Sequence, residues 1–422
     1  MTINPSSQTA PGSTGRRLVL PLAAAASAGY VCRVAITVVA PGMMHDFGLT
    51  QTQMGTVFSA FLLGYTLFQI PSGGLADRVS ARSIFLALSA GFTILTVLTA
   101  FVGWHGFGIA MLIPQLWLIR GLFGVIAAPT YPTSARTIAV TIPARLQARA
   151  NSAVLASVGV GSAVTPLLLS PVTAHYGWRA ALLVAASLSA AVGLFWWMFA
   201  PREHLVTRSA MEAINPSVSG ASSVPLRPLR SRSFWFLFAS YLLQGYLGYI
   251  FIFWFYLYLV QVRHFEVLQA ASFTALPWIA TTFAIPLGGV FSDLAVVRLG
   301  ATWGRRSLPL IALSSSAIFL VVGARTPNAT LAVAALTVCT VLVICTEGPF
   351  WATMAQLSGE HSGIAGGTMN FGSNIGGMIS PALTPWLAER IGWETALTLT
   401  AGVALVAGLL WLGVRVDATN ND

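Results

Sequence analysis

Long apolar runs separated by short polar segments dominate this sequence. A helix needs about 20 apolar residues to cross a bilayer, and twelve runs are long enough. Membrane β-strands would instead alternate polar and apolar residues over segments of about 10 residues. The pattern therefore predicts an all-α membrane protein with twelve transmembrane helices. The runs form two groups of six, at 18–42, 55–75, 83–103, 108–130, 148–170 and 179–200, and at 234–260, 268–292, 308–324, 329–355, 362–386 and 394–414.

Polar segments divide the chain into five parts. Residues 1–17 are rich in Ser, Thr, Pro and Gly, which predicts a disordered cytoplasmic N-terminus. Residues 201–232 form the one long polar connection. We interpret it as a cytoplasmic linker between a six-helix bundle at 18–200 and a second bundle at 233–415. Residues 416–422 then form a short cytoplasmic tail.

Composition and charge support a membrane location. The chain is 56% hydrophobic and only 8% charged, whereas a soluble domain carries about 25% charged residues. This argues against a soluble enzyme, a nucleic-acid binder or a disordered protein. All 22 basic residues are arginines; sixteen flank the runs on the side of the termini, four lie on the opposite side and two lie inside runs. The positive-inside rule places both termini in the cytoplasm.

The two halves of the chain repeat each other. Residues 70–77 read IPSGGLAD and residues 285–293 read IPLGGVFSD, so both contain G-x-x-x-D. Five further identical pairs share one offset of 215 residues, from Pro166 with Pro381 to Leu182 with Leu397. A common offset over half a chain is typical of a duplicated unit, here of six helices.

The loop after the second run carries a first family resemblance. It reads G-G-L-A-D-R-V-S-A-R from Gly73 to Arg82 and resembles the loop signature of the major facilitator superfamily. The resemblance implies two six-helix halves around a central cavity that opens alternately to each side. It also implies a conformational latch, in which glycine lets helices approach closely and aspartate pairs at a neighbouring helix end. The candidate latch residues are Gly73, Asp77, Arg78, Gly289 and Asp293.

A narrower resemblance rests on three segments, Y-V-C-R ending at Arg33, the run from Arg120 to Pro132, and the run from Asn370 to Pro381. They are similar to the anion:cation symporter branch, which includes bacterial galactonate and hexuronate transporters and sialin-like carriers. This implies proton-coupled uptake of an organic anion across a bacterial inner (plasma) membrane. However, Cys32 and Ala127 stand where the sugar-acid members usually carry carboxylates. The coupling route of those relatives therefore lacks its two acids here.

Three charged residues lie deep inside the predicted spans: Arg33 and Arg120 in the first half and Glu347 in the second. A charge at the bilayer centre costs at least ~2.5–3.5 kcal/mol, so such residues are usually functional. Their sum favours an anion, because an arginine can hold a carboxylate with two donors. Alternatively, each arginine locks helices together. Glu347 precedes the helix-breaking pair Gly348 and Pro349; it is either a proton carrier or one half of a gating ion pair.

Polar and aromatic residues complete the predicted substrate site. Interhelical hydrogen bonding and packing are the alternative roles for such residues. Beside Arg33 and Arg120, the candidates are Tyr30, Tyr65, Ser157, Tyr241, Gln244, Trp351, Asn370 and Asn374. The three cysteines and six histidines lack metal-ligand spacing, so we expect no metal, no cofactor and no catalytic residue.

These features predict a secondary active transporter of a small organic anion, such as a sugar acid or another carboxylate. We expect a monomer in the lipid bilayer that works by alternating access, with the proton as coupling ion and no nucleic-acid partner. An anion exchanger or uniporter, a drug or metabolite exporter, and a sensor that transports nothing remain alternatives. A cation exporter would need acidic residues in the cavity, and a sensor would need a signalling domain.

Overall fold

The computed structural model describes residues 11–104, 109–142, 144–199, 231–358 and 362–416. Within these ranges every element is a helix. The first half contains α1 (Pro11–Phe47), α2 (Gln51–Arg78), α3 (Ala81–Phe101), α4 (Ile109–Ala127), α5 (Thr130–Thr141) and α6 (Ala144–Phe199). The second half contains α8 (Arg232–Leu257), α9 (Val267–Arg325), α10 (Ala329–Ile344), α11 (Glu347–Ser358), α12 (Ser362–Ile391) and α13 (Trp393–Leu409). A π-helical turn, Tyr258–Val262, extends α8, and a 3-10 turn, Leu410–Gly413, extends α13.

Two long elements each contain two spans. α6 and α9 change direction at Gly177 (φ 83°) and Gly300 (φ 79°), a left-handed backbone that glycine adopts without steric cost. Conversely, α4 with α5 and α10 with α11 each make one span that is interrupted by two residues. Together with α1, α2, α3, α8, α12 and α13, this confirms the twelve predicted helices over the described ranges.

Hydropathy alone finds eight candidate spans in the described residues, two of them 44 and 59 residues long. These two are the double spans in α6 and α9. The helices that hydropathy misses are α2 and α12, which contain proline, glycine and polar residues at the interface between the halves. Their polarity follows from this position, because they face the other half as well as lipid.

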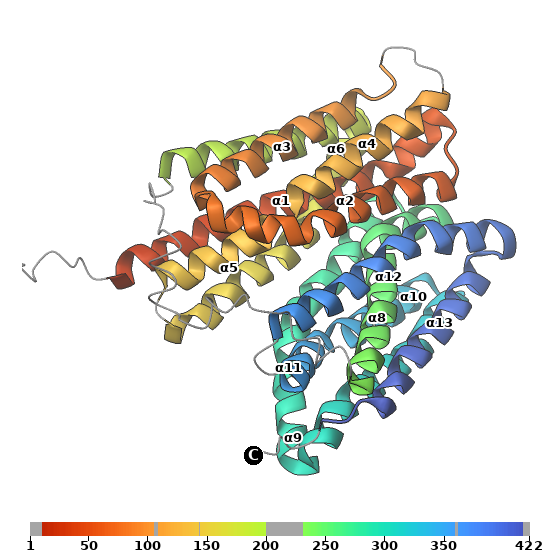
Figure 1. The fold of residues 1–422 in the computed structure, drawn as a ribbon. Helices are drawn as coiled ribbons and strands as arrows, with labels where there is room; N and C mark the ends of the chain where they lie inside the picture. Colours follow the sequence, from red (N-terminus) through yellow and green to blue (C-terminus); the bar gives the residue numbers. More distant parts are fainter. Residues whose placement is uncertain (1–10, 105–108, 143, 200–230, 359–361, 417–422) are drawn as a thin grey trace, which may run out of the picture.

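The helices form two bundles (Figure 1), with α1 to α6 in one and α8 to α13 in the other. α2 lies against α12 so closely that a Cβ on Gly55 would collide with the carbonyl oxygen of Pro381. The predicted linker falls mainly on residues 200–230, which lie outside the described ranges. α1 begins at Pro11, so residues 11–17 are helical where the sequence analysis predicted a disordered N-terminus.

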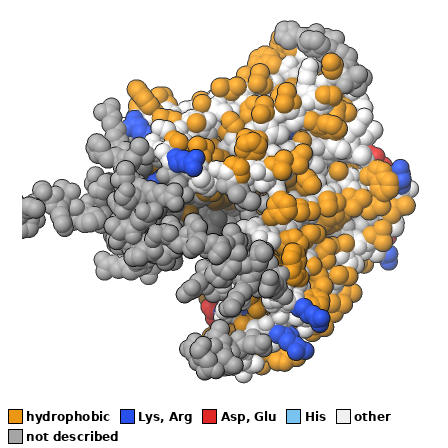
Figure 2. All heavy atoms as spheres, viewed as in Figure 1, with side chains coloured by type: hydrophobic (Ala, Val, Ile, Leu, Met, Phe, Trp, Pro, Cys, Tyr) orange, Lys and Arg blue, Asp and Glu red, His pale blue; other side chains and the backbone are white. Residues whose placement is uncertain are grey.

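Many large apolar side chains are exposed in both bundles, and they are spread over the face that Figure 2 shows. Leu118, Phe283 and Ile318 are 64–65% exposed, and many other leucines, isoleucines and phenylalanines are similarly exposed. A soluble monomer rarely exposes so extensive an apolar surface. The surface therefore faces lipid, as expected for a multi-pass membrane protein.

The two halves are hydrogen-bonded on one side of the membrane. We call this the distal side; it carries the turns at 48–50, 264–266 and 392, opposite the chain termini. There Thr52 donates to Glu389 from its main-chain nitrogen (2.9 Å) and its hydroxyl (2.6 Å). Gln51 bonds Gln261 (3.0 Å) and accepts from Trp393 (2.9 Å).

Between described residues, the hydrogen bonds that join the halves lie on this side or midway through the bundle. The bundles also diverge from the distal side toward the side of the termini (Figure 1). The structure is therefore a conformation closed on the distal side.

Candidate functional site

Arg33 lies at the centre of an aromatic cluster in the middle of α1. It is 5% exposed, and its guanidinium carbon lies 4.5 Å from the ring centre of Phe61 and 4.9 Å from that of Tyr30. Nη1 donates to the Tyr30 hydroxyl (2.9 Å), because residues three apart share a helix face. The ring of Tyr65, on α2, lies 5.8 Å away. The structure thus brings three predicted site residues together.

Arg120, on α4, joins the same cluster. It is 2% exposed, and its Nη2 donates to the main-chain oxygen of Arg33 (3.2 Å). Its guanidinium carbon lies 4.7 Å from the ring centre of Phe123 and 5.5 Å from that of Phe61. The Nε atoms of both arginines are buried without a hydrogen-bond partner. Within the described ranges, no carboxylate lies within 4.0 Å of either guanidinium.

A chain of hydrogen bonds links this cluster to the second half. Arg33 Nη2 donates to the hydroxyl of Tyr249 on α8 (3.3 Å), and this hydroxyl donates to Oδ1 of Asn374 on α12 (3.2 Å). Asn374 Nδ2 then donates to Oε1 of Gln69 on α2 (3.1 Å). The chain crosses from one half to the other and back, so it must rearrange when the halves move apart.

Glu347 lies in a second cluster, at the first residue of α11 beyond the break after α10. Its carboxylate accepts from the Tyr241 hydroxyl (2.8 Å) and from Gln244 Nε2 (2.9 Å). Both donors lie on one face of α8, and the Trp351 ring lies edge-on to Tyr241, with centroids 6.4 Å apart. The positive end of α11 adds to the stabilisation of a negative charge here.

The donors to Glu347 are all neutral. Over the described part of the chain, no arginine lies within 4.0 Å of its carboxylate. The gating ion pair with Arg33 or Arg120, one of the two interpretations of the sequence, is thus not formed in this conformation. Glu347 is half-buried, and with neutral partners it can exchange a proton without breaking an ion pair.

Two predicted site residues are placed differently. The Ser157 hydroxyl donates to the main-chain oxygen of Val154 on its own helix (2.6 Å), and its carbonyl accepts from Ser27 on α1 (2.7 Å). Ser157 therefore packs α6 against α1. Asn370 is half-buried on α12, one turn before Asn374.

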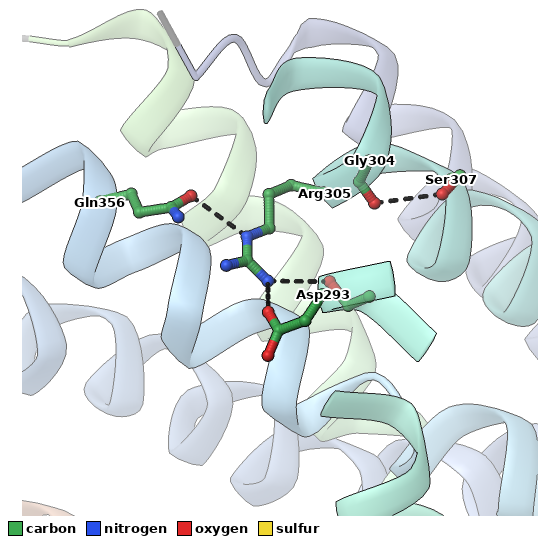
Figure 3. Close-up of polar contacts among 6 residues, drawn as sticks. Asp293, Gly304, Arg305, Ser307 and Gln356 are labelled. Atoms are coloured by element: carbon green, nitrogen blue, oxygen red, sulfur yellow. Dashed lines mark hydrogen bonds and ion pairs between the residues drawn. The ribbon is translucent and has the colours of Figure 1, made fainter. Parts of the chain in front are cut away.

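Asp293, the predicted latch aspartate of the second half, belongs to a polar cluster around Arg305 (Figure 3). Its Nη1 lies 2.7 Å from an oxygen of Asp293 and 3.1 Å from the hydroxyl of Ser292, and its Nε donates to Gln356 (3.2 Å). These contacts connect the two spans of α9 with α11. Asp293 therefore forms an ion pair within one half, with a partner that the sequence analysis did not assign; its role as a latch stays a prediction.

The latch residues of the first half are described only in part. The side chain of Asp77 lies outside the described residues, and Arg78 is exposed in the last turn of α2. Arg136, on α5, donates to a main-chain carbonyl at the end of α2. A Cβ on Gly73 or Gly289 would meet no atom within 4 Å. A Cβ on Gly348, in the first turn of α11, would however lie 3.1 Å from the Cα of Gly289, so α9 and α11 approach closely there, whereas Gly73 has no such neighbour.

Sequence reasoning missed four residues of the central cluster: Phe61, Phe123, Gln69 and Tyr249. Gln69 lies one turn after Tyr65, which is a usable signal because residues four apart share a face. Tyr249 lies eight residues after Tyr241, so it is close to the face that carries the other polar residues of α8. Phe61 and Phe123 give no signal, since an apolar residue in a span is expected everywhere.

Comparison with curated proteins finds relatives over most of the chain. A "Probable sulfoacetate transporter" of Cupriavidus necator is 30% identical, and the alignment covers 90% of this chain and 89% of the relative. The hexuronate transporter of Bacillus subtilis is 25% identical, with 90% of each chain covered. The D-galactonate transporter of Escherichia coli is 27% identical, with 91% of each chain covered.

The fold matches solved transporters as well. A bacterial homologue of the human lysosomal transporter Spinster, in an inward-facing and occupied conformation, superimposes with a TM-score of 0.76 at 19% identity. The match covers 95% of this chain and 97% of the other. The family model of the Major Facilitator Superfamily matches residues 22–371. This chain is therefore a member of the Major Facilitator Superfamily, a membrane transporter rather than an enzyme.

Proposed function

We propose that this protein takes up a small organic anion across a bacterial inner membrane, with both termini in the cytoplasm. One observation carries the proposal: two buried arginines, Arg33 and Arg120, lie in the middle of the bundle without a carboxylate among the described residues near them. Burying a charge costs free energy unless a counter-charge or hydrogen bonds offset it. An acidic substrate is the counter-charge that the site lacks.

The neighbouring side chains suit such a substrate. Tyr30, Tyr65 and Tyr249 surround Arg33 with hydroxyl groups, while Asn374 lies next in the hydrogen-bonded chain. Arginine stays protonated at physiological pH and offers several donors in a plane, which suits carboxylate or sulfonate oxygens. The relatives named for sulfoacetate, hexuronates and galactonate support an acidic substrate.

Glu347 is the proposed proton carrier. It is the one acidic residue deep in the predicted spans, and its partners Tyr241 and Gln244 are neutral. In this mechanism the carboxyl group takes up a proton on the outer side, and the anion binds to the arginines. The halves then rock about the central site, and both are released in the cytoplasm.

An anion exchanger is the alternative that one observation favours. Cys32 and Ala127 leave the arginine cluster without adjacent acids, so proton coupling would rest on Glu347 alone. An exchanger needs no titrating group. After it has released one anion, the carrier binds a second anion and returns with it to the first side of the membrane.

The experiment is transport by the purified protein in proteoliposomes. Vesicles are loaded with unlabelled sulfoacetate, glucuronate or galactonate, and entry of the same labelled anion is measured with and without an inward proton gradient. We expect counterflow of at least one anion, accumulation against its gradient when the outside is acidic, and loss of both in Arg33→Gln. Arg390→Gln is the matched control. Arg390 is exposed, and its guanidinium carbon lies 3.8 Å from the ring centre of Trp386.

The outcomes separate the possibilities. Counterflow without proton-driven accumulation would favour the exchanger. If cationic or neutral lipophilic compounds were transported in place of all the anions, and Arg33→Gln had no effect, the proposal would be wrong.

A further inference from the structure

The arginine cluster contains more positive charge than one acid group can balance. Arg33 and Arg120 lie against the same ring, with guanidinium carbons 4.5 and 5.5 Å from the centre of Phe61. They donate to phenol hydroxyls and a main-chain carbonyl, all neutral, and the Nε of each has no partner. The site therefore offers two cations and two unused donors.

Among the described side chains of the first half, no acid contacts this cluster. The one carboxylate among those side chains is Asp46, which lies at the distal end, accepts from Trp178 (2.8 Å) and pairs with Arg179 (3.7 Å). The residue before Arg33 is Cys32, whose thiol donates to the carbonyl of Ala185 (3.3 Å). Both charges of the cluster therefore remain for a ligand to neutralise.

The charge balance depends on Glu347. With Glu347 protonated, the three charged residues of the spans sum to two positive charges. A monoanionic substrate would leave one buried cation uncompensated during translocation, and an uncompensated buried charge is strongly unfavourable. A substrate with two negative charges, moving together with a proton on Glu347, leaves the loaded site neutral.

We infer that the substrate is a short dianion, with one acid group bound by Arg33 and the other by Arg120. This inference rests on the proposed function and narrows its substrate to small dicarboxylates or sulfonated carboxylates. The skeleton must be short, because both guanidinium carbons lie within 5.5 Å of the centre of the Phe61 ring. Polyhydroxylated monoanions satisfy only one arginine, and their hydroxyls do not neutralise the other.

Binding to the purified protein tests the charge count directly. Calorimetric titration compares malonate, succinate and sulfoacetate with the corresponding monoamides, which keep the size but carry one charge. Glucuronate and galactonate serve as larger monoanions. We expect each dianion that binds to do so at least about tenfold more tightly than its monoamide, because the amide leaves one buried guanidinium unpaired.

A substitution that adds an acid should reverse this preference. Ala127 lies seven residues after Arg120 on α4, so the two share a helix face, and side chains on a helix point back toward its start. Ala127→Glu therefore places a carboxylate on the face of Arg120, and the matched control Ala127→Gln adds the same bulk without charge. We expect Ala127→Glu to bind the monoamide as well as or better than the dianion, and Ala127→Gln to keep the wild-type preference.

Each result decides the matter. Monoanions that bind as tightly as dianions in the wild type would overturn the dianion inference while the proposed anion transport stands. Binding of cations in place of every anion would overturn both. If Ala127→Glu does not fold, Arg120→Gln is tested in its place. Arg120→Gln should bind the dianion and its monoamide equally tightly. A preference for the dianion in this variant would contradict the inference.

Discussion

Replacing Glu389 by alanine should open the distal side of the transporter. Glu389, near the end of α12, accepts from the main-chain nitrogen and the hydroxyl of Thr52, at 2.9 and 2.6 Å. Thr52 lies in the first turn of α2, whose main-chain nitrogens have no partners within the helix. A carboxylate from one half therefore caps a helix of the other half.

The magnitude follows from these two bonds. A hydrogen bond to a charged group contributes about 1.5–3 kcal/mol, and an anion at a helix N-terminus adds about 0.3–1 kcal/mol. Because Glu389 is exposed, solvent screening reduces both contributions. We expect the alanine variant to lose about 1–2 kcal/mol of the free energy that favours the closed side, a factor of about 5–30 in the ratio of open to closed carriers.

Double electron–electron resonance spectroscopy measures the ratio of open to closed carriers. Spin labels are attached to two introduced cysteines, Tyr176→Cys and Pro327→Cys. Both positions are exposed, and they lie in different halves on the distal side. The three native cysteines are buried and are replaced by alanine in all variants. The longer label distance should gain population in Glu389→Ala.

Glu394→Ala is the matched control. Glu394 is also an exposed distal acid, but its partner Arg325 (3.5 Å) lies in the same half. An unchanged distance distribution in Glu389→Ala, or an equal change in Glu394→Ala, would refute the idea that the cross-half cap holds this side closed.

Three further predictions concern the site and the latch. Glu347→Gln should abolish proton-driven accumulation in proteoliposomes while anion counterflow continues. The control Glu266→Gln changes an exposed acid and should leave both activities intact. Loss of counterflow as well in Glu347→Gln would point to a structural role. Arg305→Gln should lower the unfolding free energy by about 1–3 kcal/mol, since it removes charged hydrogen bonds from an 8% exposed residue. The measurement compares its thermal unfolding midpoint with that of Arg298→Gln, which changes an exposed arginine. Equal midpoints would contradict the prediction. Ser157→Ala should leave uptake rates unchanged, because its hydroxyl bonds its own helix; a clear loss of uptake would show that the hydroxyl reaches the substrate.

The sequence predicted the fold because the signal for a membrane helix is local: it lies in consecutive residues of the chain. All spans except α2 and α12 are strongly apolar, and the turns inside α6 and α9 fall between two predicted runs. The break before Glu347 was also predictable, since Gly348 and Pro349 follow it directly. These features depend on a few neighbouring residues, and so a single sequence contains them.

The contacts between the halves could not be predicted in the same way. Arg33 and Tyr249 are 216 residues apart, and Thr52 and Glu389 are 337 apart. Such pairs depend on how two rigid bundles are placed, which no local pattern encodes. Rare charges inside spans still identified Arg33, Arg120 and Glu347, since the bilayer makes each of them costly.

The most direct test of the account is whether an organic anion binds through the buried arginines. Thermal unfolding of the purified protein is followed with sulfoacetate, succinate, glucuronate and galactonate, and with the cations ethidium and tetraphenylphosphonium. A ligand at about 100 times its Kd stabilises the folded state by about 2.7 kcal/mol. The account predicts that at least one anion raises the midpoint in the wild type and in Arg390→Gln, but not in Arg33→Gln. Stabilisation by the cations alone, equal in all three proteins, would contradict it.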